Sequence, residues 1–477
     1  MSEIYQSPLG TRYASPPMQH LWNATHRAGL WRRLWLALAE TQRDLGLDIP
    51  EAALTQMRAH VDAVDLQAVR EYERSLRHDV MAHVRHFGDQ APAARPFLHL
   101  GATSAFVTDN ADLIVQREAL RLLLGRCLAT MRALEEFARR FRALPTLAYT
   151  HYQPAQLTTV GKRATLWLQD FLLDAQALHR NLAFLPFRGC KGTTGTQASY
   201  LDLFGGDHDK VRELDQRVAA AFGFPRSVAV SGQTYTRKID SQILDVLSGI
   251  AQSAAKFGTD LRLLQHEGEV LEPIEAKQVG SSAMAYKRNP MRAERICGLA
   301  RYVIAQQQNA HYTAATQWLE RTLDDSANRR LALPEAFLAC DAILVLTTNV
   351  CAGLEVREGV VRRNVEREMP FMATERWLML GVQAGGDRQT LHEVVREQSR
   401  AVAEAIARGE PNDLLRRLAG QDAFLGLDAE RLQQEMDPTL YVGRAPAQVL
   451  EFLDGPVADA LAALRDIPIP DDVPVAV

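Results

Sequence analysis

The chain has 477 residues, which is long enough for two or three domains or for one elongated architecture. Hydrophobic residues make up 47% and charged residues 23%, the balance of an ordinary globular protein. The formal net charge of -4 argues against a general nucleic-acid binder, because such proteins are usually basic.

The five cysteines are scattered along the chain without a CxxC pair or another short pairing pattern. This distribution favours free thiols in a reducing compartment over a disulfide framework or a zinc site. The first ten residues lack the basic start and apolar run of a signal peptide, and no run of about 18 apolar residues indicates a membrane span. We therefore expect a cytoplasmic protein.

Good helix formers, chiefly Ala, Leu, Arg, Glu and Gln, dominate the chain, and strand-like alternation is hardly visible. The clearest segment is 237–266, where apolar residues recur three or four positions apart. Long helices are predicted at about 110–143, 159–184, 237–266, 291–317 and 327–353. Each extends roughly 40 Å, and helices of this length have to bury their apolar stripes against one another. The predicted fold class is all-α, with a long central bundle whose surplus apolar surface suggests packing between subunits.

Breaks in the helical pattern predict three parts. The passage 94–110 is loop-rich and precedes the first long helix, whereas the chain beyond about 357 has shorter helices and more breaks. We predict a helical N-terminal domain at 1–103, a central long-helix bundle at 104–356, and a helical C-terminal domain with an irregular tail at 357–477.

The stretch "LRHDVMAHVRHF" holds three histidines, His78, His83 and His86. A zinc-binding HExxH helix places two histidines four residues apart with a glutamate between them, and this pattern is missing here. For His83 and His86 we favour a solvated or hydrogen-bonded histidine face over a metal site.

Two polar clusters leave alternatives open. His151 lies in a loop dense with hydroxyl groups, where it is either a turn residue or a general acid or base, because its pKa is naturally near neutrality. In "ERTLDDSANRR", Ser326 and the arginines stand at a helix start, which suits an anion because free N–H groups and the helix dipole favour negative charge. A capped helix with surface salt bridges explains the same residues.

The segment "VGSSAMAYKRNPMRAER" places flexible Gly and Ser residues before two cations and a helix start. Asn289 and Pro290 are typical of the N-cap and the first position of a helix. Lys287 and Arg288 therefore precede a helix N-terminus, which favours an anion, and the serines are able to close over it as a catalytic lid does. The alternative is an exposed basic loop.

Together these segments resemble the fumarase/aspartase superfamily, whose signature loop has the form GSSxMPxKxNP. Within it the chain is similar to the adenylosuccinate lyase family, in its eukaryotic-type branch. The matching segments are "SPLGTRYAS", "LRHDVMAHV", "HLGATS", "PAQLTTVGKR", "FRGCKGTTGTQAS", "GQTYTRK", "VGSSAMAYKRNPMRAER", "ERTLDDSANRR", "PFMATE" and "VGRAPAQV". They occur in order from near the N-terminus to about Arg444, so the resemblance covers nearly the whole chain.

The resemblance implies the three-part fold of this superfamily, with the central bundle as the core of a homotetramer. It implies a carbon–nitrogen lyase that releases fumarate by β-elimination, from adenylosuccinate to give AMP and from the succinyl-carboxamide ribotide SAICAR to give AICAR, in purine biosynthesis. It implies no metal and no organic cofactor, and active sites that are each shared between three subunits.

The resemblance also implies residue roles. Ser281 is the general base, His151 the general acid, and His78 a substrate-contacting histidine that supports catalysis. A serine hydroxyl has to be activated to act as a base, and Lys287 is placed to stabilise its alkoxide. The remaining matches are substrate-binding residues: Arg12, Tyr13, Arg77, Asp79, Thr103, Ser104, Thr150, Gln233, Asn289, Arg295, Arg321, Ser326 and Arg330.

One position departs from the signature, because Ala285 stands where the family usually has proline. Alanine leaves the backbone freer, so we expect loop closure to cost up to about 1 kcal/mol more. Two alternatives to the predicted function are another fumarate-releasing lyase of the superfamily, such as argininosuccinate lyase, and a non-catalytic structural paralogue.

Overall fold

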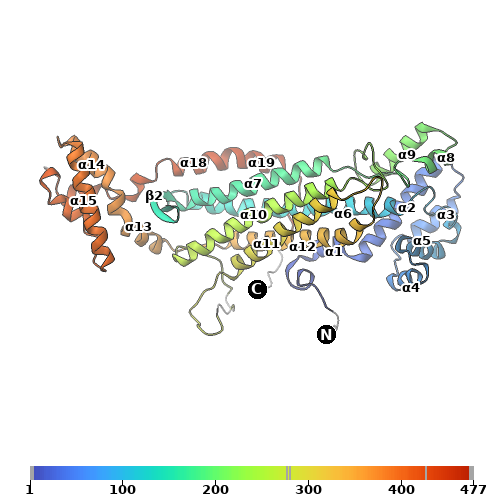
Figure 1. The fold of residues 1–477 in the computed structure, drawn as a ribbon, viewed down its shortest axis with the longest axis horizontal. Helices are drawn as coiled ribbons and strands as arrows, with labels where there is room; N and C mark the ends of the chain where they lie inside the picture. The colour runs from blue at the N-terminus through green and yellow to red at the C-terminus, as the bar shows by residue number, and fades with distance from the viewer. Residues whose placement is uncertain (1–4, 276–277, 279–280, 425–426, 472–477) are drawn as a thin grey trace.

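The computed structural model describes residues 5–275, 278, 281–424 and 427–471. Five long helices run side by side and form an elongated bundle (Figure 1). They are α6 (Ser104–Arg140), α7 (Val160–Phe184), α10 (Lys238–His266), α11 (Met291–Ala315) and α12 (Asp324–Ala352). The predicted all-α class and long bundle are confirmed, since the apolar stripes of these helices form one continuous buried core.

The largest difference in helix bounds is at the start of α6, which begins at Ser104 instead of about residue 110. The polar residues at 104–110 suggested a loop, but Asp109 and Asn110 are buried inside the first turns of the helix. Helix α12 is long and apolar enough to cross a membrane by length and composition alone, yet 67% of its apolar window is buried inside the molecule. It is packed as the core helix of the bundle.

Helices shorter than those of the bundle gather at one of its ends (Figure 1). They are α2 (Ala24–Asp44), α3 (Glu51–His60), α4 (Leu66–Leu76), α5 (Asp79–Gln90), α8 (Ala198–Leu203) and α9 (His208–Ala221). The chain reaches them through the π-helical turn η1 (Leu9–Tyr13) and helix α1 (Pro16–Trp22), which contact α12.

A second apolar cluster lies at the opposite end of the bundle (Figure 1). It joins Leu147 and Leu157 to α13 (Glu358–Met372), α14 (Thr374–Gln383), α15 (Arg388–Ala407), α16 (Leu414–Ala419) and α17 (Ala429–Gln434). The chain then returns along α7 as α18 (Ala445–Phe452) and α19 (Ala458–Ala463). Val449, Leu453 and Val457 thus belong to the bundle core, although they follow the predicted boundary at 357.

A β-hairpin occupies a segment that the sequence analysis described as a loop. Strands β1 (Pro145–Thr150) and β2 (Gln153–Thr159) pair antiparallel, with Thr150 opposite Gln153. Thr159 also caps α7 by accepting the N–H of Lys162. A second pair, β3 (Val270–Leu271) with β4 (Glu355–Val356), joins the ends of α10 and α12.

The carboxylate of Asp174 is buried in the bundle without an ion-pair partner among the described residues. Asp174 on α7 is 8% exposed, and its Oδ2 has no hydrogen-bond partner. Burial raises the pKa of Asp174 from 3.8 to about 7. The folded state therefore holds a proton that the unfolded chain releases above pH 4, and this carboxyl lowers stability as pH rises from about 4 to 7.

We predict that Asp174→Asn removes this pH-dependent penalty. The difference in free energy of unfolding between variant and wild type grows with pH and levels off above about pH 7. It reaches up to about 4 kcal/mol for a shift of about three pKa units. Melting temperatures of both proteins at pH 4.5 and pH 8 measure this difference. An equal difference at both pH values would contradict the assignment.

Candidate active site

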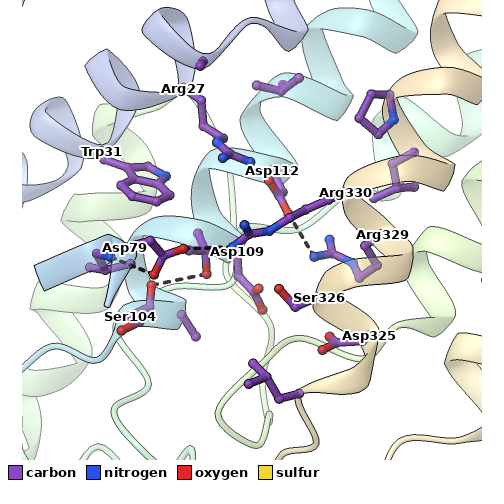
Figure 2. A pocket seen from close by; sticks show the side chains of 18 of the residues that line it. Arg27, Trp31, Asp79, Ser104, Asp109, Asp112, Asp325, Ser326, Arg329 and Arg330 are labelled. Atoms are coloured by element: carbon purple, nitrogen blue, oxygen red, sulfur yellow. Dashed lines mark hydrogen bonds and ion pairs between the residues drawn. The ribbon is translucent and has the colours of Figure 1, made fainter. Parts of the chain in front are cut away.

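A cavity of about 710 Å³ lies where the starts of α5, α6, α10 and α12 meet (Figure 2). Eight of the residues predicted from the sequence line it: Arg77, His78, Asp79, Ser104, Gln233, Arg321, Ser326 and Arg330. Thr103 directly precedes α6 at its N-cap, beside Ser104. The structure thus brings together the predicted residues of four separate sequence segments.

The floor of the cavity is a set of buried ion pairs between α6, α10 and α12. Arg329 pairs with Asp112 at 2.9 Å and with Asp240 at 2.7 Å. Arg237 pairs with Asp109 at 3.1 Å and with Asp325 at 2.7 Å. Burial of the two arginines opposes their charge, but these carboxylates outweigh it and raise the pKa of Arg237 and of Arg329.

Tyr235 completes this floor. Its hydroxyl accepts a hydrogen bond from Arg329 Nη2 at 2.6 Å and donates one to Asp240 Oδ1 at 2.6 Å. Burial raises the pKa of Tyr235 well above its usual value, so the phenol stays neutral. A neutral hydroxyl therefore links Arg329 to Asp240 within this network of charged side chains.

The wall of the cavity carries more accessible cations. Arg330 extends from α12 across the cavity and pairs with Asp79 on α5 at 2.8 Å (Figure 2). Burial raises the pKa of Asp79, but the N–H of Val80 and the Arg330 guanidinium outweigh this effect and hold the pKa below its usual value. Arg321 pairs with Asp325 at 2.9 Å. Because the Arg330 side chain is 54% exposed and Arg329 only 9%, Arg330 is much the more accessible of the two to an anionic ligand.

His78 stands at the N-cap of α5, where its Nδ1 accepts the N–H of Met81 at 3.3 Å. A neutral His78 then carries its proton on Nε2. His83 packs against Trp31, and burial lowers the pKa of His83 to about 4. His86 accepts the N–H of Asp65 at 3.3 Å and is therefore hydrogen-bonded as expected, whereas the buried Nδ1 of His83 has no hydrogen-bond partner among the described residues. Among the residues that the structure describes, no group of three His, Cys, Asp or Glu side chains is placed to hold a metal ion.

The predicted acid lies at the other end of the bundle. His151 and Tyr152 form the two-residue turn of the β1–β2 hairpin, with φ of 52° and 57°. Positive φ at both positions is typical of a type I′ turn, which usually selects Asn-Gly. The turn exposes His151 and places it beyond the C-terminal end of α6, whereas the cavity lies at its N-terminal end. A helix of this length spans about 55 Å, so His151 cannot reach the cavity of its own chain.

The predicted base lies in the connection between the end of α10 and the start of α11, also remote from the cavity. Ser281 Oγ accepts the N–H of Met284 at 3.2 Å, and the N–H of Lys287 bonds to the carbonyl of Met284 at 3.0 Å. Val279 and Gly280 of the signature loop lie outside the described residues. The Lys287 side chain is exposed on the same connection.

The start of α11 corrects a prediction. The helix begins at Met291 with Pro290 at the N-cap, so the proposed Asn289 cap and Pro290 start are wrong by one residue. Glu272 supplies the cap instead, since its carboxylate accepts the N–H of Arg292 at 3.1 Å and of Ala293 at 2.9 Å. The helix N-terminus that the sequence assigned to an external anion is therefore occupied by the chain's own carboxylate.

Three further predicted substrate-binding residues, Arg12, Tyr13 and Arg295, come together near the start of α11. The guanidinium of Arg295 is 5.5 Å from the centre of the Tyr13 ring. Burial, and the positive charge of Arg12 nearby, lower the pKa of Arg295. These three residues come together, but they lie near the start of α11 and not in the cavity at the start of α12.

Comparison with known proteins identifies the family. The model of a family described as "Lyase" matches residues 19–305, and that of "Adenylosuccinate lyase C-terminus" matches residues 370–452. The chain is 47% identical to adenylosuccinate lyase of Schizosaccharomyces pombe over 99% of both chains. It is 47% identical to that of Saccharomyces cerevisiae over 96% of this chain and 95% of the other.

The chain belongs to the adenylosuccinate lyase family. It is therefore a lyase, and the resemblance drawn from its motifs is confirmed. Among solved structures, a fumarate lyase from Mesorhizobium sp. BNC1 matches with a TM-score of 0.78 and 24% identity over 95% of this chain and 100% of the other. The 3-carboxy-cis,cis-muconate lactonizing enzyme from Pseudomonas putida matches with 0.79 and 23%, over 96% and 98%. These two likenesses show the fold.

Sequence reasoning missed several cavity residues of this family member. They are Arg27, Asp109, Asp112, Arg237 and Arg329. The signal was available in part, because Asp109 and Asp112 are three residues apart and share one face of a helix. Asp109 fell in the passage 94–110 that was predicted to be loop-rich, so the shared face was not recognised.

Ala285, which stands where the family signature usually has proline, lies in a turn from Met284 to Lys287, and this position allows a test of its effect. Ala285 is the second residue of this turn, a position that favours proline. We predict that Ala285→Pro lowers the cost of ordering the loop by up to about 1 kcal/mol, and so raises kcat/KM by up to about five-fold. Steady-state kinetics and hydrogen exchange of the loop measure the effect.

The matched variant is Ala283→Pro, which removes an N–H that Ser281 Oγ accepts at 3.4 Å and should lower kcat/KM. Unchanged kinetics and unchanged loop exchange in Ala285→Pro would refute the role given to this position.

Proposed function

We propose that the enzyme cleaves adenylosuccinate to fumarate and AMP, and SAICAR to fumarate and AICAR, in purine nucleotide biosynthesis. The observation that carries the proposal is its 47% identity to two adenylosuccinate lyases over nearly their full length. The cavity fits such substrates, because its accessible arginines are suited to bidentate contacts with phosphate or carboxylate. The proposed location is the cytoplasm, in keeping with five free cysteines.

The β-elimination reaction requires a separate role for each proposed catalytic residue. Elimination needs a base for the proton beside a carboxylate, an acid for the departing nitrogen, and positive or N–H-rich surroundings for the charge that develops on the carboxylate. We assign the base to Ser281, activated by Lys287, and the acid to His151. His78 supports catalysis from the cavity, and Asn289 holds the loop or the substrate carboxylate. A loop that closes over the substrate keeps water from the reaction.

We further propose a homotetramer in which each active site combines residues of three subunits. The proposal rests on the separation of the predicted residues along helices of about 40–55 Å, because no single chain brings His151 or Ser281 to its own cavity. Exposed apolar residues at helical spacing support it, since Leu166 and Leu173 on α7 are 48% and 56% exposed. Neighbouring copies are the natural cover for this face.

Fumarate release tests the activity. The purified protein, incubated separately with adenylosuccinate, SAICAR and argininosuccinate, is expected to release fumarate from the first two only. Release from argininosuccinate alone would favour the alternative lyase, and no release from any of them would favour a structural paralogue.

Two substitutions test the residue roles. His151→Ala and Ser281→Ala are each expected to lower kcat by at least about a thousand-fold while the assembly stays intact. Ser282→Ala, at the exposed neighbouring serine, is the matched control and should retain activity. A kcat close to wild type in either variant would remove that residue from its role.

Mixing the two inactive variants tests the shared site. Subunits of His151→Ala and Ser281→Ala, exchanged under mild denaturation and reassembled, should regain activity, because some mixed sites receive both intact residues. Failure to regain activity in an assembly shown to be mixed would contradict a site that takes His151 and Ser281 from different chains.

A further inference from the structure

Asp341 is a buried carboxylate in α12 with two partners from distant parts of the chain. It is 0% exposed, and Arg126 Nε on α6 donates to its Oδ1 at 2.6 Å. The backbone N–H of Ser15 donates to its Oδ2 at 2.7 Å. A buried charge is tolerated only when it is paired and hydrogen-bonded, so both contacts stabilise this arrangement.

The bond to Ser15 fixes the N-terminal segment on the bundle. Ser15 follows η1 by two residues, and its hydroxyl caps α1 by accepting the N–H of Met18 at 3.4 Å. Leu9 and Met18, on either side, are buried in the main core. The Ser15–Asp341 bond is thus a directional polar contact between two apolar anchors, and it sets how the segment lies along α12.

The segment carries two of the proposed substrate-binding residues. Arg12 and Tyr13 lie in η1, and the Tyr13 ring faces the guanidinium of Arg295 at 5.5 Å. Burial lowers the pKa of Arg295, and the positive charge of Arg12 lowers it further. Two neighbouring guanidinium groups are suited to an anionic group of a nucleotide.

We propose that Asp341 is a positioning residue, which holds the Ser15 backbone so that Arg12 and Tyr13 face Arg295 in the nucleotide-binding part of the site. The inference rests on the proposed function for the identity of the ligand. It assigns to Asp341 a role in substrate affinity through the N-terminal segment, with no contact to the reacting atoms.

The position of Ser15 permits a clean test. Its φ of -68° suits proline, and Ala14 before it has the extended conformation, with ψ of 148°, that a residue before proline adopts. Ser15→Pro therefore removes the N–H donor to Asp341 together with the hydroxyl, and because the proline Cδ takes the place of the amide hydrogen, the Asp341 carboxylate has to move away from the Ser15 backbone. Ser15→Ala removes the hydroxyl alone and is the matched control.

Kinetic and binding measurements on the two variants show how the loss of the Ser15–Asp341 bond changes ligand affinity. Because a hydrogen bond to a charged acceptor corresponds to about ten-fold in an equilibrium constant, Ser15→Pro should raise the KM for adenylosuccinate and the Kd for AMP about ten-fold above Ser15→Ala. The value of kcat should stay within about two-fold. Equal KM and Kd in the two variants would overturn the proposal, and so would a lower melting temperature with unchanged KM.

Hydrogen exchange of residues 7–14 provides a readout that does not depend on activity. Exchange should be faster in Ser15→Pro than in Ser15→Ala, and equal exchange would overturn the positioning role. If the wild-type protein releases no fumarate, the proposed function fails, while the exchange comparison still decides whether Asp341 positions this segment.

Discussion

The cavity depends on the buried pairs of Arg237 and Arg329 with the carboxylates of α6, α10 and α12. A buried pair gains little over a well-packed apolar contact, but the loss of one partner costs about 3–5 kcal/mol because the other charge is left unpaired. The network therefore acts mainly as a constraint on the relative position of the three helices. It fixes the start of α12, and with it Arg321, Ser326 and Arg330 around the cavity.

The length of the helices is the second constraint. The same bundle that buries a continuous core carries His151 and the Ser281 loop away from the cavity. A chain with this architecture places its cation-rich cavity and its proposed proton-transfer residues far apart, which is why we propose that neighbouring chains bring them together. Exposure of His151 and of residues 282–287 in a single chain agrees with this proposal. The proposed shared site links catalysis to assembly, because under this proposal an isolated chain holds only one part of the site.

Much of the fold was predictable from local patterns. The stripe at 237–266 gave α10 to within one residue, because helix periodicity is a local property. The hairpin at His151 and Tyr152 was not predictable in this way, since neither residue is a usual turn former. The cap of α11 was missed because Glu272 lies about twenty residues before the helix and reaches it only through the fold. Asp109, which is buried, and Asp112, which is partly buried, were missed because charge in a sequence normally indicates solvent.

The candidate site was predicted by resemblance more than by pattern. The motifs supplied the residue set, and eight of its members do line one cavity. Their division between two ends of the bundle is a property of the tertiary structure, which no spacing in the sequence expresses. Asp341 and Ser15 illustrate the same limit, because their bond joins residues 326 positions apart.

The most direct measurement is a crystal structure of the assembled Ser281→Ala enzyme with adenylosuccinate bound. The account predicts that the substrate occupies the cavity lined by His78 and Arg330 of one subunit, with His151 and residue 281 supplied by neighbouring subunits within reach of the bond that breaks. A substrate bound elsewhere, or one contacted by a single chain only, would contradict it.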